Sequence, residues 1–429
     1  MVLNFSMMEL VRQKGRKLDK ELKQQLIDFY KPFRSIPCFL QRPLENIRKR
    51  MKKLPVIIEF EDGSFASGLN DVKQTKCRNL REFPSISSCS TQLTLKNMEK
   101  LMSTCDHIKK VHYDRKVTAL LDNAVPSINS HLLQENGLTG KDVTIAVIDT
   151  GIYPHADLER RITGFQDFVG NQTDPYDDNG HGTHCAGDAA SNGSASDGQY
   201  KGPAPEANLV GVKVLNKMGA GSLSTVIHGI EWCIENQSTN NIDILSLSLG
   251  ADTTESAEDD PVVKAVDAAW DSGMVVCVAA GNSGPQEQTI GSPGISPKVI
   301  TVGAADDNNN TDRSDDTVAD FSSRGPTIDG ITKPDLITPG VNIVSLRAPN
   351  SFIDKTNKQA RVDSDYISLS GTSMATPICA GVVAQLLQSA PDLTPDEVKA
   401  KLMEASEDLG QPSNVQGSGY LNAENLIEQ

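Results

Sequence analysis

The sequence predicts an α/β protein, in which a doubly wound parallel sheet with helices on both faces follows a small α+β domain. Three observations indicate this. From residue 141 onward, short apolar runs alternate with helical patterns, as in strands joined by helical crossovers. Residues 274–280 are uniformly apolar, which is typical of a strand buried on both faces. The chain has 429 residues, enough for two or three domains.

The first 54 residues are polar, basic and weakly patterned. Leu18, Leu22 and Leu26 recur at helical spacing and predict a short amphipathic helix. The Lys/Arg-rich run 48–53 indicates a solvated linker face rather than a patch that binds nucleic acid. We therefore assign residues 1–54 to an N-terminal basic extension.

Residues 55–121 predict the small α+β domain. A β-rich run at 56–60 ends in a Glu-Asp-Gly turn signal. Thr94 can cap a helix that reaches about residue 105, because its hydroxyl can accept a hydrogen bond from a free backbone N–H. A second strand is expected at 108–117.

A segment rich in Asn, Ser, Pro and Gly, residues 122–140, predicts a linker. Residues 141–429 then predict the large domain. Its strands are expected at 143–148, 209–215, 242–249, 274–280 and 298–304, and its helices at 222–235, 261–272, 372–389 and from 395.

The charge is divided unevenly along the chain. The net charge is −15, yet residues 1–120 hold 24 Lys/Arg against 13 Asp/Glu, and the rest holds 17 against 43. The acidic bulk argues against a nucleic-acid-binding protein. A basic front and an acidic body suggest that the two parts dock on each other, although two separately solvated surfaces remain an alternative.

Several classes of location are disfavoured. No apolar run approaches the roughly 18 residues of a membrane-spanning helix. The N-terminus lacks the apolar stretch of a signal peptide. The eight cysteines show no C-x-x-C spacing, and reduced thiols are expected. We therefore expect a cytoplasmic protein without membrane contact.

Four glycine-rich segments carry reactive or polar side chains, A-V-I-D-T-G, N-G-H-G-T-H, A-A-G-N-S-G-P and S-G-T-S-M-A-T-P. They present Asp149, His181, Asn282 and Ser373. A serine hydroxyl needs an adjacent base, and the base needs an orienting partner. His181 is suited to be the base and Asp149 its partner. A backbone N–H at the helix start and the Asn282 amide could hold a developing oxyanion. These residues together predict acyl transfer.

The chain order Asp, His, Ser is that of subtilisins. Residues of about 141–425 resemble the subtilisin-like serine proteases (subtilases), and Asp149 and His181 stand 32 positions apart, as is usual there. The whole chain resembles the long intracellular subtilases of bacilli, the AprX type. The resemblance implies a subtilisin-like fold, a triad of Asp149, His181 and Ser373, and an oxyanion amide at Asn282.

The resemblance also implies where a substrate binds. One edge segment, residues 219–221, pairs with an extended substrate. A second edge, residues 248–250, and a strand end, residues 279–281, form the walls of the pocket for the residue before the scissile bond. Because these walls are small, a preference for large apolar or aromatic side chains and broad specificity for proteins and peptides is expected. The substrate-binding residues are Gly219, Gly221, Ser248, Leu249, Gly250, Ala279, Ala280 and Gly281.

Residues 55–121 resemble the inhibitor-type propeptide of the family, which implies a self-inhibited precursor whose N-terminal domain is an intramolecular inhibitor and folding chaperone. The cut is expected within about 115–140. No organic cofactor is required. A calcium site is left open, with no ligand assigned: Asp157 resembles a calcium ligand of extracellular members, whereas the spacing of Asp174, Asp177 and Asp178 does not match an EF-hand loop.

Some alternatives stay open. His184, three residues after His181, is interpreted as a packed histidine rather than half of a metal pair. Cys185 resembles the cysteine of thiol-dependent subtilases; the alternative interpretation is that it is buried and unreactive. The chain could also be a binding protein with its cleft permanently covered, or a serine esterase or amidase. Turnover of esters, short peptides and casein would separate these. For residues 306–316 and 350–365 the sequence suggests no function.

Overall fold

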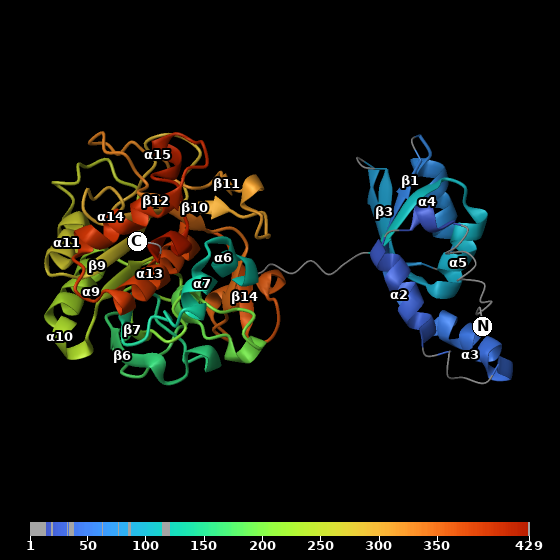
Figure 1. Ribbon diagram of the computed structural model, residues 1–429, viewed down its shortest axis with the longest axis horizontal. Helices are drawn as coiled ribbons and strands as arrows, with labels where there is room; N and C mark the ends of the chain where they lie inside the picture. Colours follow the sequence, from blue (N-terminus) through green and yellow to red (C-terminus); the bar gives the residue numbers. More distant parts are fainter. Residues whose placement is uncertain are drawn as a thin grey trace. The chain divides into compact units, whose positions relative to one another are not determined.

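The computed structural model describes residues 14–18, 20–31, 33, 38–61, 63–75, 77–84, 87–113 and 121–427. The chain divides into two compact units, Met1–Val117 and Thr118–Gln429 (Figure 1). The observed boundary lies close to the predicted end of the α+β domain. Residues 114–120, which include the end of the predicted strand and the start of the predicted processing region, lie outside the described residues.

The N-terminal unit is built on a four-stranded antiparallel sheet with the order β2-β3-β1-β4. Both predicted strands and the helix between them are present, and the Thr94 hydroxyl accepts the Asn97 N–H as its cap. Its strands are β1 Lys53–Phe60, β2 Arg78–Phe83, β3 Ser88–Thr94 and β4 Ile108–Tyr113, and its helices are α2 Lys20–Tyr30, α3 Cys38–Met51, α4 Phe65–Gln74 and α5 Leu95–Thr104.

The predicted amphipathic helix exists as α2, but it is not part of a separate extension. Leu22 and Leu26 are fully buried in the same core as Val56 and Ile58 of β1. Helix α2 contacts β4, and α3 contacts β3 and α5. The predicted boundary at residue 54 is therefore wrong, because an apolar helical stripe needs a partner surface and finds it on this sheet.

The basic run 48–53 is largely exposed, as predicted for a solvated face, but it is not a linker. It covers the end of α3 and the start of β1. Lys49 is only 3 % exposed, and its Nζ lies 2.7 Å from Glu45 Oε1 and 3.0 Å from Glu99 Oε2. This buried ion cluster joins α3 to α5, and a buried charge is tolerated only when it is paired in this way.

The large unit contains a ten-stranded, mainly parallel sheet with the order β15-β16-β12-β10-β9-β8-β5-β7-β6, and β11 pairs with β10. The predicted strands all occur, within two residues of their expected ends. The strands are β5 Thr144–Asp149, β6 Ile162–Asp167, β7 Asn208–Lys213, β8 Ile244–Leu247, β9 Val275–Ala279, β10 Ile300–Asp306, β11 Thr317–Val318, β12 Leu336–Pro339, β15 Ser406–Glu407 and β16 Tyr420–Leu421; β13 Ile343–Leu346 and β14 Tyr366–Leu369 form a separate hairpin.

Helices cover both faces of this sheet, as the sequence predicts. Helices α13 and α8 pack on each other, and α13 crosses β8, β9, β10 and β12 (Figure 1). Helices α9 and α11 pack on each other and contact β5 and β9. The helices are α8 His181–Ala190, α9 Leu223–Glu235, α10 Gln237–Asn240, α11 Pro261–Asp271, α12 Phe352–Thr356, α13 Thr372–Ser389, α14 Pro395–Glu404 and α15 Ser413–Gln416, preceded by α6 Leu121–Ser127 and α7 Ser130–Glu135.

The strand order reverses beside β5. From β5 the chain builds β7 and β6 on one side and β8, β9, β10 and β12 on the other. In open α/β sheets, ligands bind outside the carboxyl ends of the strands at such a reversal. Asp149 ends β5, so the topology places it at the position where a site is expected.

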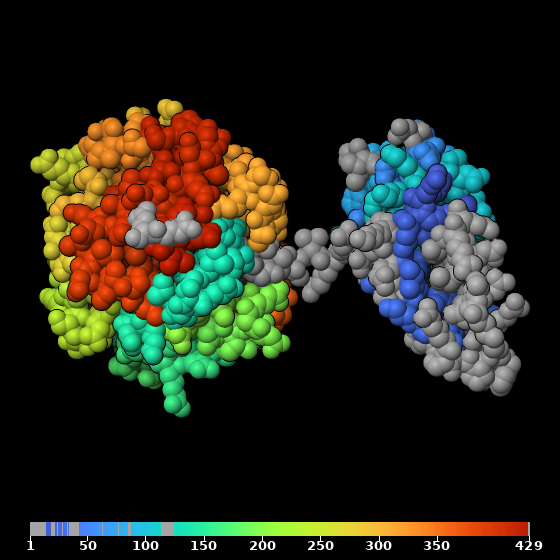
Figure 2. All heavy atoms as spheres, viewed as in Figure 1, coloured from blue at the N-terminus to red at the C-terminus, as the bar shows by residue number. Residues whose placement is uncertain are grey.

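Residues 122–140 are not a linker. Residues 121–127 form α6 and residues 130–135 form α7, and Ala124, Ile128 and Leu133 are buried in the core of the large unit. The Ser127 hydroxyl also lies 3.0 Å from the Tyr420 hydroxyl. Figure 2 shows this segment packed against the C-terminal residues of the chain. Polar, loop-forming composition was a poor guide here because a few buried apolar side chains decide the packing.

Among the described residues, no helix combines the length and the apolarity needed to cross a bilayer.

Candidate active site

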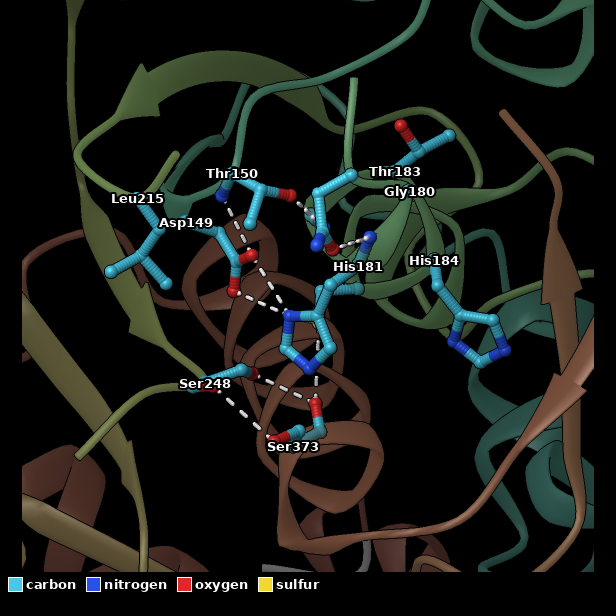
Figure 3. A network of polar contacts seen from close by, with 12 residues as sticks. Asp149, Thr150, Gly180, His181, Thr183, His184, Leu215, Ser248 and Ser373 are labelled. Carbon is cyan, nitrogen blue, oxygen red and sulfur yellow. Dashed lines mark hydrogen bonds and ion pairs between the residues drawn. The ribbon is translucent and has the colours of Figure 1, made fainter. Parts of the chain in front are cut away.

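His181 and Asp149 come from neighbouring elements at the carboxyl edge of the sheet. Asp149 is the last residue of β5, and His181 is the first residue of α8. His181 Nδ1 donates to the carboxylate of Asp149, at 2.8 Å from Oδ1 and 2.9 Å from Oδ2 (Figure 3). The carboxylate is fully buried, whereas the imidazole side chain is 23 % exposed. This bond leaves Nε2 as the ring nitrogen that can accept a proton.

The electrostatics favour a charged imidazole. Burial disfavours the imidazolium, but the negative charge and hydrogen bonds of Asp149, together with the neighbouring Cys185 sulfur, outweigh it and raise the pKa of His181 well above its ordinary value. The carboxylate therefore both fixes the ring tautomer and stabilises the positive charge that arises when Nε2 takes up a proton.

Asp177 holds the start of α8 and was not assigned this role by sequence reasoning. Its Oδ1 accepts the Gly180 N–H at 2.8 Å and the Thr150 hydroxyl at 3.0 Å, and its Oδ2 accepts the Thr183 N–H at 2.9 Å. These bonds tie the His181 loop to the end of β5. An acidic residue shortly before a helix start was the available signal.

Ser373 is the second residue of α13, where backbone N–H groups have no intrahelical acceptor. In Figure 3 the imidazole of His181 lies between the Asp149 carboxylate and Ser373. The hydroxyl donates to the Ser248 carbonyl oxygen at 3.2 Å, and the Ser248 hydroxyl donates to the Ser373 carbonyl oxygen at 2.8 Å. This reciprocal pair fixes the start of α13 against the end of β8.

The Asn282 side chain is oriented by Thr372, a residue that sequence reasoning did not single out. Asn282 Oδ1 accepts the Thr372 backbone N–H at 2.9 Å and the Thr372 hydroxyl at 3.1 Å. Because the oxygen end of the amide is held by α13, the NH₂ end is left for another acceptor. Asn282 is exposed, so an acceptor can reach it from solvent.

These side chains line one cleft of about 650 Å³. The cleft follows the carboxyl ends of β5, β8 and β9, and His181, Ser373 and Asn282 all contribute to its wall. All the predicted substrate-binding residues line it as well, namely Gly219, Gly221, Ser248, Leu249, Gly250, Ala279, Ala280 and Gly281.

The two neighbours of His181 that left alternatives open are both buried. His184 Nδ1 lies 2.9 Å from Asp188 Oδ2, and its Nε2 lies 3.2 Å from the Ile343 carbonyl oxygen. Both ring nitrogens therefore have polar partners within the protein. Cys185 Sγ lies 3.8 Å from His181 Nδ1 and 3.4 Å from the Ser373 carbonyl oxygen. Burial raises the pKa of Cys185 to about 11, which keeps it a neutral thiol at neutral pH.

Asp157 does not fit a calcium site. Its Oδ1 accepts the Ala195 N–H at 2.7 Å and the Ser194 hydroxyl at 3.1 Å. Its Oδ2 accepts the Tyr366 hydroxyl at 2.5 Å and the Ser191 hydroxyl at 2.9 Å. The carboxylate is fully buried, and protein donors occupy both oxygens, which leaves it unavailable to a cation.

Asp177 and Asp178, which precede His181, also have protein partners at their carboxylates. Asp177 accepts the bonds described above, and Asp178 Oδ1 lies 2.8 Å from Lys213 Nζ. Across the described part of the chain, one group of three His, Cys, Asp or Glu side chains has converging ligand atoms: Asp149, His181 and Cys185. That group belongs to the site itself.

This chain belongs to the subtilase family, whose model matches residues 140–420. It is 53 % identical over 441 aligned positions to serine protease AprX of Bacillus subtilis (strain 168), covering 99 % of both chains. It is 36 % identical to subtilisin DY of Bacillus licheniformis, covering 70 % of this chain and 96 % of that one. The chain is therefore a serine protease of the AprX type.

A solved structure is also similar. A cold-adapted subtilisin-like serine proteinase aligns with a TM-score of 0.52 at 32 % sequence identity, covering 66 % of this chain and 90 % of that chain. The predicted subtilisin-like fold is thereby confirmed.

Proposed function

We propose that the chain is an endopeptidase that hydrolyses proteins through an acyl-enzyme on Ser373. The observation that carries the proposal is the pair of hydrogen bonds from His181 Nδ1 to Asp149, with the other edge of the imidazole facing Ser373 (Figure 3). In this role Ser373 is the nucleophile, His181 the general base and Asp149 the residue that orients the base.

The proton moves through His181 Nε2. The Ser373 O–H turns from the Ser248 carbonyl oxygen toward Nε2, and Oγ attacks the carbonyl carbon as Nε2 takes the proton. Nε2–H then protonates the departing amine, and an ester between the substrate acyl group and Oγ remains. Water, deprotonated by the same nitrogen, hydrolyses that ester and restores the serine hydroxyl.

The negative oxygen of each tetrahedral intermediate needs donors that are already in place. Two donors support this step: the backbone N–H of Ser373 at the start of α13 and the NH₂ group of Asn282, whose oxygen is held by Thr372. Because both are fixed before the reaction, little reorganisation is needed as the charge develops.

The substrate would lie extended along the cleft. Gly219 and Gly221 offer backbone for pairing, which supplies affinity with little demand on sequence. Residues 248–250 and 279–281 wall the pocket before the scissile bond with small groups, which supports a preference for large apolar or aromatic side chains. Backbone pairing over several residues favours protein substrates over simple esters.

The N-terminal unit is proposed to be an intramolecular inhibitor and folding chaperone, so that the chain is made as a precursor. The surplus of basic residues in 1–120 and of acidic residues in the rest supports electrostatic docking. Residues 121–135, which contain α6 and α7, are packed in the large unit, so we place the cut before residue 121. The cytoplasmic location stays a prediction.

Expression of the full chain and of Ser373→Ala tests this proposal. Wild type should lose roughly 12–15 kDa with time, and it should gain activity on an apolar chromogenic peptide and on casein that a serine-directed inhibitor abolishes. Ser373→Ala should stay whole and silent. A wild-type chain that is active while uncut would contradict the proposal of an inhibited precursor. An active Ser373→Ala variant would contradict the assignment of Ser373 as the nucleophile.

If wild type stays whole and silent, residues 118–429 should be assayed alone and after mixing with residues 1–117. Activity that the N-terminal unit suppresses would show that the unit is a standing inhibitor. Silence of both preparations would favour a binding protein.

A further inference from the structure

The segment between β13 and β14, for which the sequence suggested no function, reaches the substrate cleft. It contains α12, and the first two residues of that helix, Phe352 and Ile353, line the same cleft as His181 and Ser373. Both side chains are only partly buried. Partly exposed apolar side chains on the wall of a binding cleft are available to a ligand.

A buried carboxylate holds this segment in place. Asp354, whose side chain is 4 % exposed, lies 2.8 Å from Arg347 Nη1 and 2.6 Å from Arg361 Nε. Its Oδ2 also accepts the Asn350 N–H at 2.9 Å. Burial disfavours the charge, but these partners outweigh it and lower the pKa of Asp354. Helix α12 is too short to be stable alone, and this network therefore fixes its position.

Helix α12 is docked directly on the loop before His181. The Phe352 N–H donates to the Asp178 carbonyl oxygen and the Ile353 N–H to the Asn179 carbonyl oxygen, each at 2.9 Å. Gly180 has a φ of +104°, and a Cβ there would lie 2.6 Å from the Ser351 hydroxyl. Glycine thus allows α12 to approach the loop that carries His181.

The same loop borders the edge segment that is proposed to pair with substrate. Asn179 Nδ2 donates to the Lys217 carbonyl oxygen at 2.9 Å, next to Met218 and Gly219 on the cleft wall. Leu215 and Met218 add apolar surface there. The charge of Asp178, beside α12, is paired with Lys213.

We infer that Phe352 and Ile353 form a specificity wall for the substrate side chain two positions before the scissile bond, and that this wall selects an apolar residue. A substrate paired with residues 219–221 would run past Asn179 toward His181. The substrate residue two positions before the scissile bond would then lie closest to α12. The inference rests on the proposed function, because it assumes that the acyl side of the substrate pairs with residues 219–221.

Three peptides that differ only two positions before the scissile bond, carrying Leu, Gly or Asp, test this inference in the mature enzyme. Wild type should cleave the Leu peptide with a kcat/KM at least about ten-fold above the Gly peptide, because a few methylenes in an apolar pocket discriminate by that much. Phe352→Ala and Ile353→Ala should each reduce this ratio several-fold. Ile353→Trp should shift preference toward Gly by narrowing the subsite.

A matched control is Ile328→Ala, since Ile328 is 54 % exposed and is not among the cleft-lining residues. It should leave the ratio unchanged. The ratio separates a specificity role from a structural one: if α12 only supported His181, its variants would lower kcat/KM for all three peptides by the same factor.

An equal loss on all peptides, or an unchanged Leu-to-Gly ratio, would overturn the inference while leaving the proposed function intact. A second set of peptides, varied only at the residue after the scissile bond, checks the position of the subsite. If the Phe352 and Ile353 variants changed selectivity only within that second set, the inference would also be overturned. Failure of the wild-type enzyme to cleave any peptide would instead count against the proposed function.

Discussion

His181 Nδ1 lies 2.8 and 2.9 Å from the two carboxylate oxygens of Asp149, although 32 positions separate the residues in the chain. The contact exists because a parallel sheet brings the end of β5 beside the start of α8. It defines which ring nitrogen is free, and the predictions about catalysis depend on it.

Asp149→Asn should retain the fold and lose most activity. An amide can hold the ring in the wrong tautomer and cannot stabilise the imidazolium, and in serine-protease triads this change lowers kcat by about 10⁴-fold. Substrate affinity should change little. Single-turnover kinetics on an apolar chromogenic peptide would measure the loss, and a decrease of less than about ten-fold would argue against the orienting role.

The pH dependence should be shifted to alkaline values. His181 must be neutral to accept the serine proton, and its pKa is raised well above the ordinary value. Activity is therefore retained above that pKa and lost as the pH falls through it. A profile of kcat/KM between about pH 5 and pH 10 should show its acid limb above that of an unperturbed histidine. In Asp149→Asn the residual activity should have its acid limb at lower pH.

Asn282→Ala should lower kcat by about 10²–10³-fold with little change in KM, as is found when one oxyanion donor is removed. Thr372→Val should have a smaller effect, about five- to ten-fold, because one of the two hydrogen bonds that orient the amide is lost. Thr372→Ser keeps the hydroxyl and serves as the control. Steady-state kinetics on a single peptide would decide, and a KM-dominated loss in Asn282→Ala would contradict the oxyanion role.

Cys185 should resist alkylation in the folded protein. With a pKa of about 11 and no exposure, it is almost entirely a protonated thiol at pH 8. Iodoacetamide at that pH should modify Cys77, which is partly exposed, before Cys185, and activity should survive. Peptide mapping by mass spectrometry measures this order. Rapid loss of activity that Cys185→Ser prevents would show that the thiol is reactive after all.

Leu26→Ala should destabilise the whole N-terminal unit. Leu26 is fully buried in the core shared by α2 and the sheet, and such truncations cost about 2–5 kcal/mol. In the Ser373→Ala background, amide hydrogen exchange in β1 and β3 should become faster. Ile47→Ala is the matched control, since Ile47 is 55 % exposed. If exchange stayed slow in Leu26→Ala, α2 would be an appendage of the sheet and not part of its core.

The sequence by itself determined which side chains to expect at the cleft and most of the elements around it. Strand and helix patterns are local, and a cap signal such as Thr94 before α5 acts over three or four residues, so this start was predicted correctly. The order of Asp149, His181, Asn282 and Ser373 could be read without coordinates because each stands in its own glycine-rich motif.

Tertiary structure alone decided what packs on what. The helical stripe containing Leu26 did not show that its partner is the neighbouring sheet, and the polar composition of 122–140 concealed the burial of Ile128. Nor could the sequence show that the Tyr366 hydroxyl donates a hydrogen bond to the carboxylate of Asp157, 209 positions away, or that Ile353 lines the cleft. These outcomes depend on contacts between distant segments, whose free energies arise from mutual burial and pairing and leave no local pattern in the chain.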